Sequence, residues 1–365
     1  MDAPAVATAI EKGLQQSRLS FTSEKFPVGD GGDGTAALLL QRLGGQLIEA
    51  TVHDPLGRKI STSFGWIEKN ETAIIELADA SGLRLLRPDE YNPLRSTTQG
   101  TGELIRQALD KKAKRIIIGI GGSATVDGAS GILTELGIRF LDGNGNILPH
   151  LPESLVYLEQ MNTSNLDQRI LNAELVVLCD VDNYLLGKAG AAAIFGPQKG
   201  ADEGTVIRLE AGLNRLQEVA MRTTGRDMAN IEHGGAAGGV AAALSVFLGA
   251  RLVSGIEYFL SITEFDQALE KATIVITGEG SIDQQTLQGK APFGVAKNAK
   301  KYQVPVIALA GKLPLTISQD LRNYFNILLS INHEPLGLQL ALQHTEVNLA
   351  RTAREIGELL ALADE

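Results

Sequence analysis

Short, unbroken apolar runs constrain the fold of this chain more than any other feature of its sequence. Parallel strands that helices cover on both faces read as continuous apolar runs, whereas half-exposed strands alternate with polar residues. Segments with helical spacing of apolar residues separate some of the runs, and strands that alternate with helices predict an α/β fold. The predicted helices are 102–112, 291–301 and 347–362. The predicted buried strands are 115–120, 175–179, 273–277, 304–310 and 327–331.

Glycine or a carboxylate follows most of these predicted strands. The sequence GGSATVDG comes after the run at 115–120, DVDN comes after 175–179, and GEGSID comes after 273–277. Ligands of open α/β sheets bind beyond the carboxyl ends of the strands. The alternative is that Gly and Asp only terminate these strands, as they do in many proteins. One such loop favours that alternative, but three of them together favour a site.

The chemistry of these loops suits a phosphate ligand. Glycine-rich turns expose consecutive N–H groups that bind anions, and a helix that starts just after such a turn adds its positive end. A lysine beside glycine supplies a point charge for phosphate. Lys188, Lys199 and Lys290 each have a glycine neighbour. For each of them the alternative is a solvated surface lysine.

The motifs of several large enzyme classes do not occur in the sequence. It has no GxxxxGK[ST] loop, no kinase HRD or DFG set and no GxSxG elbow, and GIGGSA does not match GxGxxG. The five histidines have no metal-ligand spacing, which argues against zinc. Hard oxygen ligands with phosphate point to Mg²⁺ instead. The candidate carboxylates are Asp30, Asp33, Asp127, Asp180, Asp182, Glu279 and Asp283.

Length and composition limit the class of protein. A chain of 365 residues is longer than one ordinary core, so two domains are expected. A net charge of −10 argues against a nucleic-acid partner. The single cysteine excludes an intramolecular disulfide and suits a reducing compartment. We find neither a signal peptide nor an apolar run long enough for a bilayer, so we expect a cytoplasmic protein without a membrane partner.

Eight motifs occur in order along the chain: PVGDGGDGT, STTQGTGELI, GIGGSATVDG, CDVDN, GKAGAAAIFGPQKGA, GGAAGGVAAAL, VSGIE and TGEGSIDQQTLQGKAP. They resemble the motifs of the bacterial glycerate 2-kinase family, also called class II glycerate kinase. The resemblance covers nearly the whole chain. It implies ATP-dependent, Mg²⁺-assisted phosphorylation of D-glycerate in an interdomain cleft, with 2-phosphoglycerate as the typical product.

The resemblance also implies two α/β domains, one inserted into the other. A discontinuous Rossmann-like domain would consist of residues 1–45 and 272–365. A flavodoxin-like domain would occupy residues 46–271. The junctions are therefore expected near Gly45 and Ala272. Oligomeric state stays open, since a monomer and a homo-oligomer both fit the sequence.

Site residues follow from the resemblance motif by motif. Asp180 matches the aspartate of the family's CDVTNP segment, which implies a catalytic base or a Mg²⁺ ligand; the alternative is an Asp that caps a turn. Lys290 is the second catalytic candidate, and Glu279 is the second candidate Mg²⁺ ligand. The residues expected to bind substrate or phosphate are Asp30, Gly31, Gly32, Gly121, Gly122, Ser123, Thr125, Asp127, Lys188, Lys199, Gly278, Glu279, Gly280 and Asp283. For the loop around Gly31 a tight turn without ligand is an equal alternative.

The sequence departs from the family pattern at a few places. Asp182 and Tyr184 stand where the family has threonine and proline. The family's first strand and its Ser/Lys loop have no counterpart ahead of the predicted helix that starts after Met1. Two further hypotheses stand beside a glycerate kinase. A kinase for another small hydroxy acid stays open, because the sequence does not show the shape of the pocket. A weakened or non-catalytic ligand-binding relative is the hypothesis that the missing first strand favours.

Overall fold

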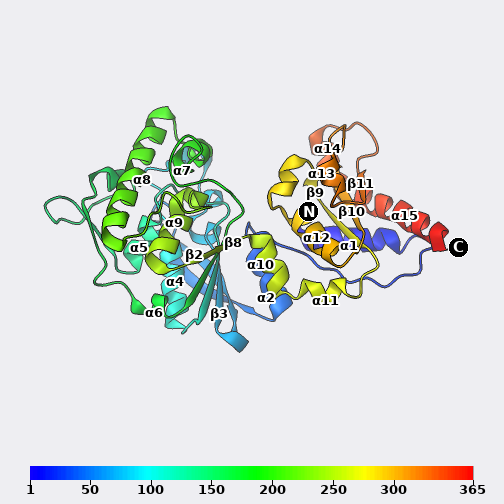
Figure 1. The fold of residues 1–365 in the computed structure, drawn as a ribbon, viewed down its shortest axis with the longest axis horizontal. Coiled ribbons are helices and arrows are strands. Elements are labelled where there is room, and N and C mark those ends of the chain that lie inside the picture. The colour runs from blue at the N-terminus through cyan, green and yellow to red at the C-terminus, as the bar shows by residue number, and fades with distance from the viewer. Residues whose placement is uncertain (365) are drawn as a thin grey trace. The chain divides into compact units, whose positions relative to one another are not determined.

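The computed structural model describes residues 1–364 and contains two compact units (Figure 1). Unit 2 comprises Asp30–Gly255, and unit 1 comprises Met1–Gly29 together with the chain from Ile256 onward. Unit 1 is therefore discontinuous. The predicted segment 272–365 ends on Glu365, which lies outside the described residues. The names Rossmann-like and flavodoxin-like stay predictions.

The observed boundaries differ from the expected junctions near Gly45 and Ala272 because of local packing. Helix α2 (Thr35–Leu43) packs against the sheet of unit 2, where the Leu40 side chain fills the space over Gly65. Helix α11 (Phe265–Leu269) belongs to unit 1 because Phe265 packs edge-to-face on Phe26 at 4.8 Å between ring centroids. Neither contact is readable from the motifs.

Unit 2 is built on a six-stranded mixed sheet in the order β1-β2-β3-β4-β7-β8. Strands β1, β2 and β3 pair antiparallel, whereas β3, β4, β7 and β8 pair parallel. The two predicted strands of this unit are confirmed as β4 and β7, while the β1–β2 hairpin was not predicted. The bounds are β1 Gln46–His53, β2 Lys59–Ile67, β3 Thr72–Glu76, β4 Arg115–Gly119, β7 Glu174–Leu178 and β8 Arg251–Val253.

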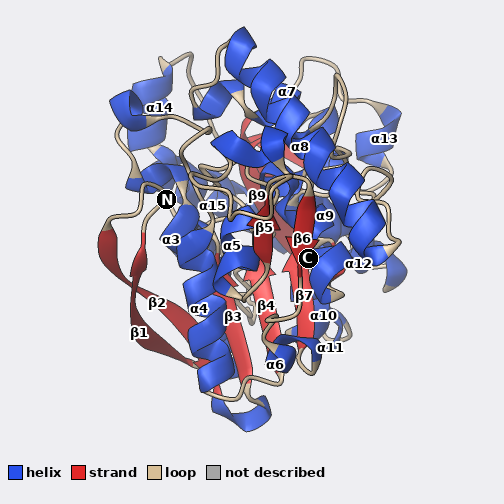
Figure 2. Cartoon of the chain, turned by 90° about the vertical axis from the view of Figure 1, so that its left-hand side faces the viewer, coloured by secondary structure: helices blue, strands red, loops and turns tan. Residues whose placement is uncertain are grey.

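Helices cover this sheet, which is why its central strands are continuously apolar (Figure 2). Ile116 and Ile118 in β4 are fully buried, as is the whole of β3. The helices of unit 2 besides α2 are α3 Ala78–Ser81, α4 Gln99–Asp110, α5 Ser130–Glu135, α6 Gln168–Leu171, α7 Ala191–Phe195, α8 Glu203–Thr224 and α9 Ala236–Leu248. A small antiparallel pair, β5 Arg139–Leu141 and β6 Gln160–Asn162, lies outside the main sheet.

Unit 1 has a three-stranded parallel sheet in the order β11-β10-β9. Its strands are β9 Val275–Ser281, β10 Val306–Lys312 and β11 Ile327–Ser330. The core joins Ile307 and Leu309 of β10 to Ile10 of α1 and Ala353 of α15. The helices are α1 Ala3–Leu14, α10 Gly255–Ile262, α11, α12 Ala291–Lys301, α13 Gln319–Arg322, α14 Leu338–Gln343 and α15 Thr345–Asp364. The predicted helix 291–301 is confirmed as α12.

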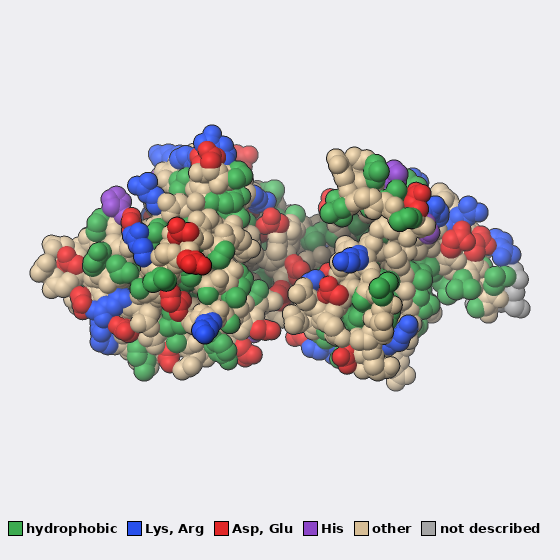
Figure 3. Space-filling view, turned by 90° about the horizontal axis from the view of Figure 1, so that it is seen from above, with side chains coloured by type: hydrophobic (Ala, Val, Ile, Leu, Met, Phe, Trp, Pro, Cys, Tyr) green, Lys and Arg blue, Asp and Glu red, His purple; other side chains and the backbone are tan. Residues whose placement is uncertain are grey.

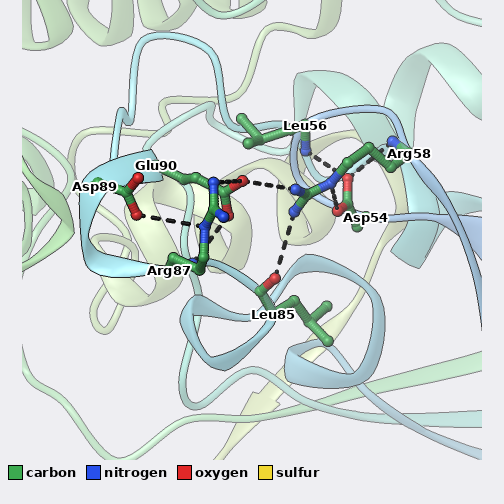
Figure 4. Close-up of polar contacts among 7 residues, drawn as sticks. All are labelled: Asp54, Leu56, Arg58, Leu85, Arg87, Asp89 and Glu90. Atoms are coloured by element: carbon green, nitrogen blue, oxygen red, sulfur yellow. Dashed lines mark hydrogen bonds and ion pairs between the residues drawn. The ribbon is translucent and has the colours of Figure 1, made fainter.

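A polar network fixes the segment that follows α3 in unit 2 (Figure 4). Nε of Arg58 donates to Oδ2 of Asp54 at 2.5 Å, and Nη1 of Arg58 donates to Oε1 of Glu90 at 2.7 Å. The backbone amides of Leu56 and Arg58 donate to Oδ1 of Asp54, so this buried carboxylate also shapes the β1–β2 turn. We assign the network a structural role, since its groups satisfy one another.

The surface carries mixed charge. On the face drawn in Figure 3, Lys and Arg side chains lie among Asp and Glu rather than in one basic patch. Within residues 1–364, no helix combines the length and the apolar character that crossing a membrane requires.

Candidate functional site

The candidate site of unit 2 lies at the edge where its four parallel strands end. The carboxyl ends of β3, β4, β7 and β8 share this edge because the strands are parallel neighbours. The loop that starts at Asp30 passes over it. A Cβ on Gly31 would lie 2.9 Å from Cβ of Leu178, and a Cβ on Gly119 would lie 2.9 Å from the Gly31 carbonyl oxygen. Only glycine permits this approach of the loop to the strand ends.

The two predicted glycine loops of unit 2 lie against each other. A Cβ on Gly121 would come within 2.9 Å of the Gly32 Cα. Gly122 has a φ of +66°, and a Cβ there would lie 3.1 Å from a carboxylate oxygen of Asp33. The fold therefore brings together residues that are about ninety positions apart in the sequence, as expected for loops at one edge of a sheet. The Asp30 carboxylate is half-buried and accepts a 3.2 Å hydrogen bond from the Gly32 amide.

A carboxylate that the motifs did not single out anchors this edge. Glu76 ends β3, and its Oε1 accepts a 2.8 Å hydrogen bond from the Ala36 amide. Its Oε2 accepts from the Gly34 amide at 3.1 Å. The negative charge thus lies at the positive N-terminus of α2. Glu76 ends the apolar run TAIIE, so the strand-end signal used for the other loops applies to it as well.

A second unpredicted carboxylate lies close by. The Asp79 carboxyl group is largely buried beside Glu76, and this burial raises its pKa to about 6. Arg84 pairs with Asp79 and also lies 3.9 Å from Asp33. The sequence offers no separate signal for this pair, because Asp79 and Arg84 belong to none of the glycine loops.

The Asp127 side chain lies inside unit 2 and stabilises the loop between β4 and α5. Its side chain is fully buried, and its carboxylate accepts hydrogen bonds from four donors: the amides of Thr98, Ala129 and Gly131 and the Thr98 hydroxyl. Burial raises the pKa of Asp127, and these donors oppose the rise. The sequence predicted a ligand contact here, whereas the observed geometry engages both oxygens within the protein.

Lys199 also lies inside, beneath the same loop. Only 2% of the residue is exposed, and its Nζ donates to the Ser123 hydroxyl and to the Thr125 carbonyl, each at 2.7 Å. Burial lowers the pKa of the Lys199 ammonium to about 7, an effect that the nearby Asp127 carboxylate opposes. The Thr125 hydroxyl is buried without a hydrogen-bond partner among the described residues. By contrast, Lys188 is exposed in its turn.

The glycine run at 234–239 packs against this loop. Ala237, Gly238 and Gly239 all have left-handed backbone angles at the start of α9. A Cβ on Gly238 would lie 2.3 Å from the Thr125 carbonyl oxygen, and the Gly128 amide donates to the Gly238 carbonyl at 3.0 Å. Close packing accounts for the glycines of this run.

Asp180 has the most distinctive environment at the edge. Its Oδ1 accepts a 2.9 Å hydrogen bond from the Gly255 amide, and the Ser254 side chain also bonds to its carboxylate. Its Oδ2 is buried and has no hydrogen-bond partner among residues 1–364. Burial, with a smaller contribution from Asp30, raises the pKa of Asp180 to about 6, against the opposing effects of its two donors and His233. Perturbed carboxylates of this kind cluster at functional sites.

His233 is a neighbour that sequence reasoning missed. Its Nδ1 lies 2.8 Å from the Val181 carbonyl oxygen and 3.3 Å from Oδ1 of Asp182, whose side chain is 76% exposed. Because a carbonyl only accepts, this contact places a hydrogen on Nδ1. His233 has a φ of +64°, which is uncommon for a residue with a side chain. The sequence signal that could have identified His233 is its position directly before the GGAAGG run.

The predicted residues of unit 1 form a separate group at the end of β9. Oε1 of Glu279 accepts a 2.5 Å hydrogen bond from the Thr286 hydroxyl, and Oε2 lies 3.5 Å from Nζ of Lys290. Asp283 caps the following 3₁₀ turn through the Gln285 amide. Lys290 is the N-cap residue of α12, so it lies at the positive end of that helix. Gly278 and Gly280 flank Glu279 within β9.

The oxygen ligands of this chain suit Mg²⁺ only where substrate phosphates and water complete its coordination shell. Within residues 1–364, no three His, Cys, Asp or Glu side chains converge on one metal position. Mg²⁺ commonly takes one or two protein carboxylates and completes its shell with substrate phosphates and water. The unpartnered Oδ2 of Asp180 is a ligand of the right kind. Glu279 offers oxygen ligands in the other unit, where Thr286 and Lys290 already contact it.

Comparisons with known proteins agree over the full chain. A family profile described as the Glycerate kinase family matches residues 1–361. A glycerate kinase of Bacillus subtilis (strain 168) is 42% identical over 363 residues, which cover 100% of this chain and 95% of that protein. A glycerate 2-kinase of Escherichia coli (strain K12) is 41% identical and covers 99% and 95%. A crystal structure described as that of a candidate glycerate kinase 2 from Salmonella typhimurium LT2 superposes with a TM-score of 0.87, at 40% identity, over 100% and 96% of the two chains.

Proposed function

The chain belongs to the glycerate kinase family, and on that premise we propose that it transfers the γ-phosphoryl group of ATP to D-glycerate and yields 2-phosphoglycerate. The observation that carries the proposal is the strand-end edge of unit 2. There a largely buried carboxylate with one unpartnered oxygen, Asp180, lies at the edge where the glycine loops of unit 2 meet. Phosphoryl transfer needs mainly such positioning, charge stabilisation and an acceptor for the hydroxyl proton.

Asp180 is the proposed acceptor of the proton from the glycerate hydroxyl. With a pKa raised to about 6, its carboxyl group is ionised at neutral pH and binds a proton more readily than an ordinary aspartate does. The Gly255 amide fixes Oδ1, so Oδ2 is the oxygen free for this task. The second role that fits the same oxygen is Mg²⁺ ligation.

Backbone amides and cations are proposed to hold the anionic groups. The turn at Gly121–Gly122 supplies N–H groups in unit 2, whereas the Gly31 and Gly32 amides already donate to Thr35 and Asp30. In unit 1, Lys290 and the N-terminus of α12 supply positive charge beside Gly278–Gly280. Mg²⁺, held by Asp180 or Glu279 together with the ATP phosphates, would neutralise charge on the transferred group.

The direct test is ADP release by the purified chain with Mg-ATP, with and without D-glycerate. Glycerate-dependent ADP release supports the proposal, and phosphorus NMR of the product shows which hydroxyl carries the phosphate. Comparing kcat/KM for D-glycerate with that for lactate-like and tartronate-like acids tests for a different hydroxy-acid substrate. ATP binding without turnover on any of these acids would instead support a non-catalytic relative.

Three further expectations stay predictions from the sequence. They are the reaction in an interdomain cleft, the cytoplasmic location and the open choice between monomer and homo-oligomer.

A further inference from the structure

The amino group of Lys199 is buried and hydrogen-bonded within the protein, unlike that of a surface lysine that binds phosphate. Lysine is rarely buried unless it is paired, yet no ion pair joins Lys199 to a carboxylate among residues 1–364. Its two hydrogen bonds go instead to the Ser123 hydroxyl and the Thr125 carbonyl, both in the β4–α5 loop. The nearest carboxylate that influences it, Asp127, already accepts four hydrogen bonds from other groups. With 2% exposure, Lys199 cannot itself contact a ligand in solution.

The bond from Lys199 determines what the Ser123 hydroxyl can do. A serine hydroxyl has one hydrogen to donate and two lone pairs. Its oxygen accepts from Nζ at 2.7 Å, so the hydroxyl hydrogen must point elsewhere. Among the described residues, no acceptor takes that hydrogen. Ser123 is 8% exposed, compared with 2% for Lys199 and 0% for Thr125, so it is the most accessible of these three buried residues.

We propose that Lys199 is a positioning residue that orients the Ser123 hydroxyl to donate a hydrogen bond to an anionic group of the bound ligand. The anion is either the carboxylate of the hydroxy acid or a phosphate of the nucleotide. The inference rests on the proposed function, because it assigns a contact within that site. Lys199 acts here through Ser123, because the hydrogen bond from its Nζ polarises the Ser123 hydroxyl and makes it a better donor.

The neighbouring glycines place the Ser123 hydroxyl beside further donors. Gly121 and Gly122 directly precede Ser123, and both are pressed against the loop at Gly32 and Asp33. The backbone amides of this turn and the Ser123 hydroxyl therefore belong to one short segment. Contacts with Lys199 and with the loop at Gly32 hold this segment in place. Its hydrogen-bond donors therefore need no further rearrangement to meet a bound anion.

The test is a double-mutant cycle with Ser123→Ala, Lys199→Met and the double variant. Steady-state kinetics are measured with D-glycerate varied at saturating Mg-ATP, and with Mg-ATP varied at saturating D-glycerate. Lys69→Met serves as the control, because Lys69 is an exposed lysine of the same unit that belongs to none of the predicted binding loops. Melting temperatures are recorded for all variants. Isothermal titration with ATP and with D-glycerate separately is added, since it reports binding even without turnover.

Losing a hydrogen bond to a charged group costs roughly tenfold to a hundredfold in affinity. We expect Ser123→Ala to raise one KM, for glycerate or for ATP, by about that factor with little change in kcat. The affected KM identifies which anion Ser123 contacts. Lys199→Met should raise the same KM similarly, and the double variant should be no worse than the more affected single variant. Lys69→Met should match the wild type.

Three results would overturn the inference. First, Ser123→Ala could leave both KM values and both affinities unchanged. This result would be decisive even if the Lys199 variant did not fold. The effects of the two substitutions could multiply, which would show independent roles. Lys199→Met could lower only kcat and the melting temperature, which would indicate a purely structural lysine. Failure of the proposed function is distinct, because it appears as a wild-type chain without glycerate-dependent turnover, while the two titrations still report on the contact.

Discussion

The Gly255 amide donates a 2.9 Å hydrogen bond to Oδ1 of Asp180, whereas Oδ2 of the same carboxylate is buried without a partner among residues 1–364. The two oxygens are therefore inequivalent. One is fixed by the backbone at the end of β8, and the other is desolvated and unsatisfied. An unsatisfied buried acceptor is costly, so its presence in a folded protein calls for an explanation. A proton, a Mg²⁺ ion or a substrate hydroxyl would each satisfy Oδ2.

Replacing Asp180 with asparagine should abolish most of the turnover without unfolding the protein. The amide side chain of the Asp180→Asn variant would keep an oxygen for the Gly255 amide but would lack the charge. We expect kcat to fall about a hundredfold or more, the usual contribution of a general base, with the melting temperature within a few degrees of wild type. Asp182→Asn is the matched control, because Asp182 is largely exposed, and should retain activity. Unchanged activity in Asp180→Asn rejects both proposed roles of Asp180.

The same variant separates the base from the metal ligand. If Asp180 binds Mg²⁺, the variant needs more Mg²⁺ for half-maximal activity and recovers partly at high concentration. If Asp180 is the base, added Mg²⁺ does not restore kcat. Titrating Mg²⁺ against ADP release for wild type and variant decides between them.

The raised pKa of Asp180 predicts an acid limb in the pH dependence of activity. The carboxyl group must be ionised to accept a proton, and burial raises its pKa to about 6. We therefore expect kcat/KM to increase with pH up to about 6 and to level above it. The residual activity of Asp180→Asn should lack this limb. A wild-type profile that stays flat from about pH 5 to about pH 8 contradicts Asp180 as the base.

Asp127→Asn should destabilise the fold. Four donors converge on the buried Asp127 carboxylate. The amide NH₂ of asparagine would face some of these donors and could not accept hydrogen bonds from them. We expect a loss of about 2–4 kcal/mol in the free energy of unfolding, measured with urea. Asp142→Asn is the comparison, since Asp142 accepts backbone hydrogen bonds in an exposed turn and should cost less. Equal losses would show that the burial of Asp127 adds nothing.

Lys199 should make the stability of the protein increase with pH above neutrality. Its pKa is about 7 in the folded protein, against an ordinary value of 10.5. Between these values the unfolded chain binds a proton that the folded chain does not, so raising the pH favours folding. Compared with Lys199→Met, the wild type should gain about 2 kcal/mol between about pH 7 and about pH 9. Urea unfolding at both pH values measures this, and Lys188→Met should behave as wild type. Parallel changes in wild type and Lys199→Met would disprove the shift.

Much of the local architecture was predictable because it depends on local patterns. The run at 116–120 is apolar throughout, and its residues 116–119 form the buried part of strand β4. Helix α12 begins and ends where its apolar spacing predicts. The β1–β2 hairpin escaped prediction, because its strands are partly exposed and carry no continuous apolar run. The unit boundaries also escaped prediction, since they depend on which sheet a helix packs against.

By itself, the sequence determined the α/β class, the loops that follow the strands and the family of the chain, because strand periodicity, glycine turns and ordered motifs are properties of neighbouring residues. The tertiary structure decided which polar groups face solvent. Lys199 and Lys188 look alike in the sequence, yet one is buried and the other exposed. Asp127 and Asp180 both follow strands, yet four donors engage the first and one oxygen of the second is unpartnered. Burial and hydrogen-bond partners depend on contacts between distant segments, and these contacts determine the charge state and reactivity of each side chain.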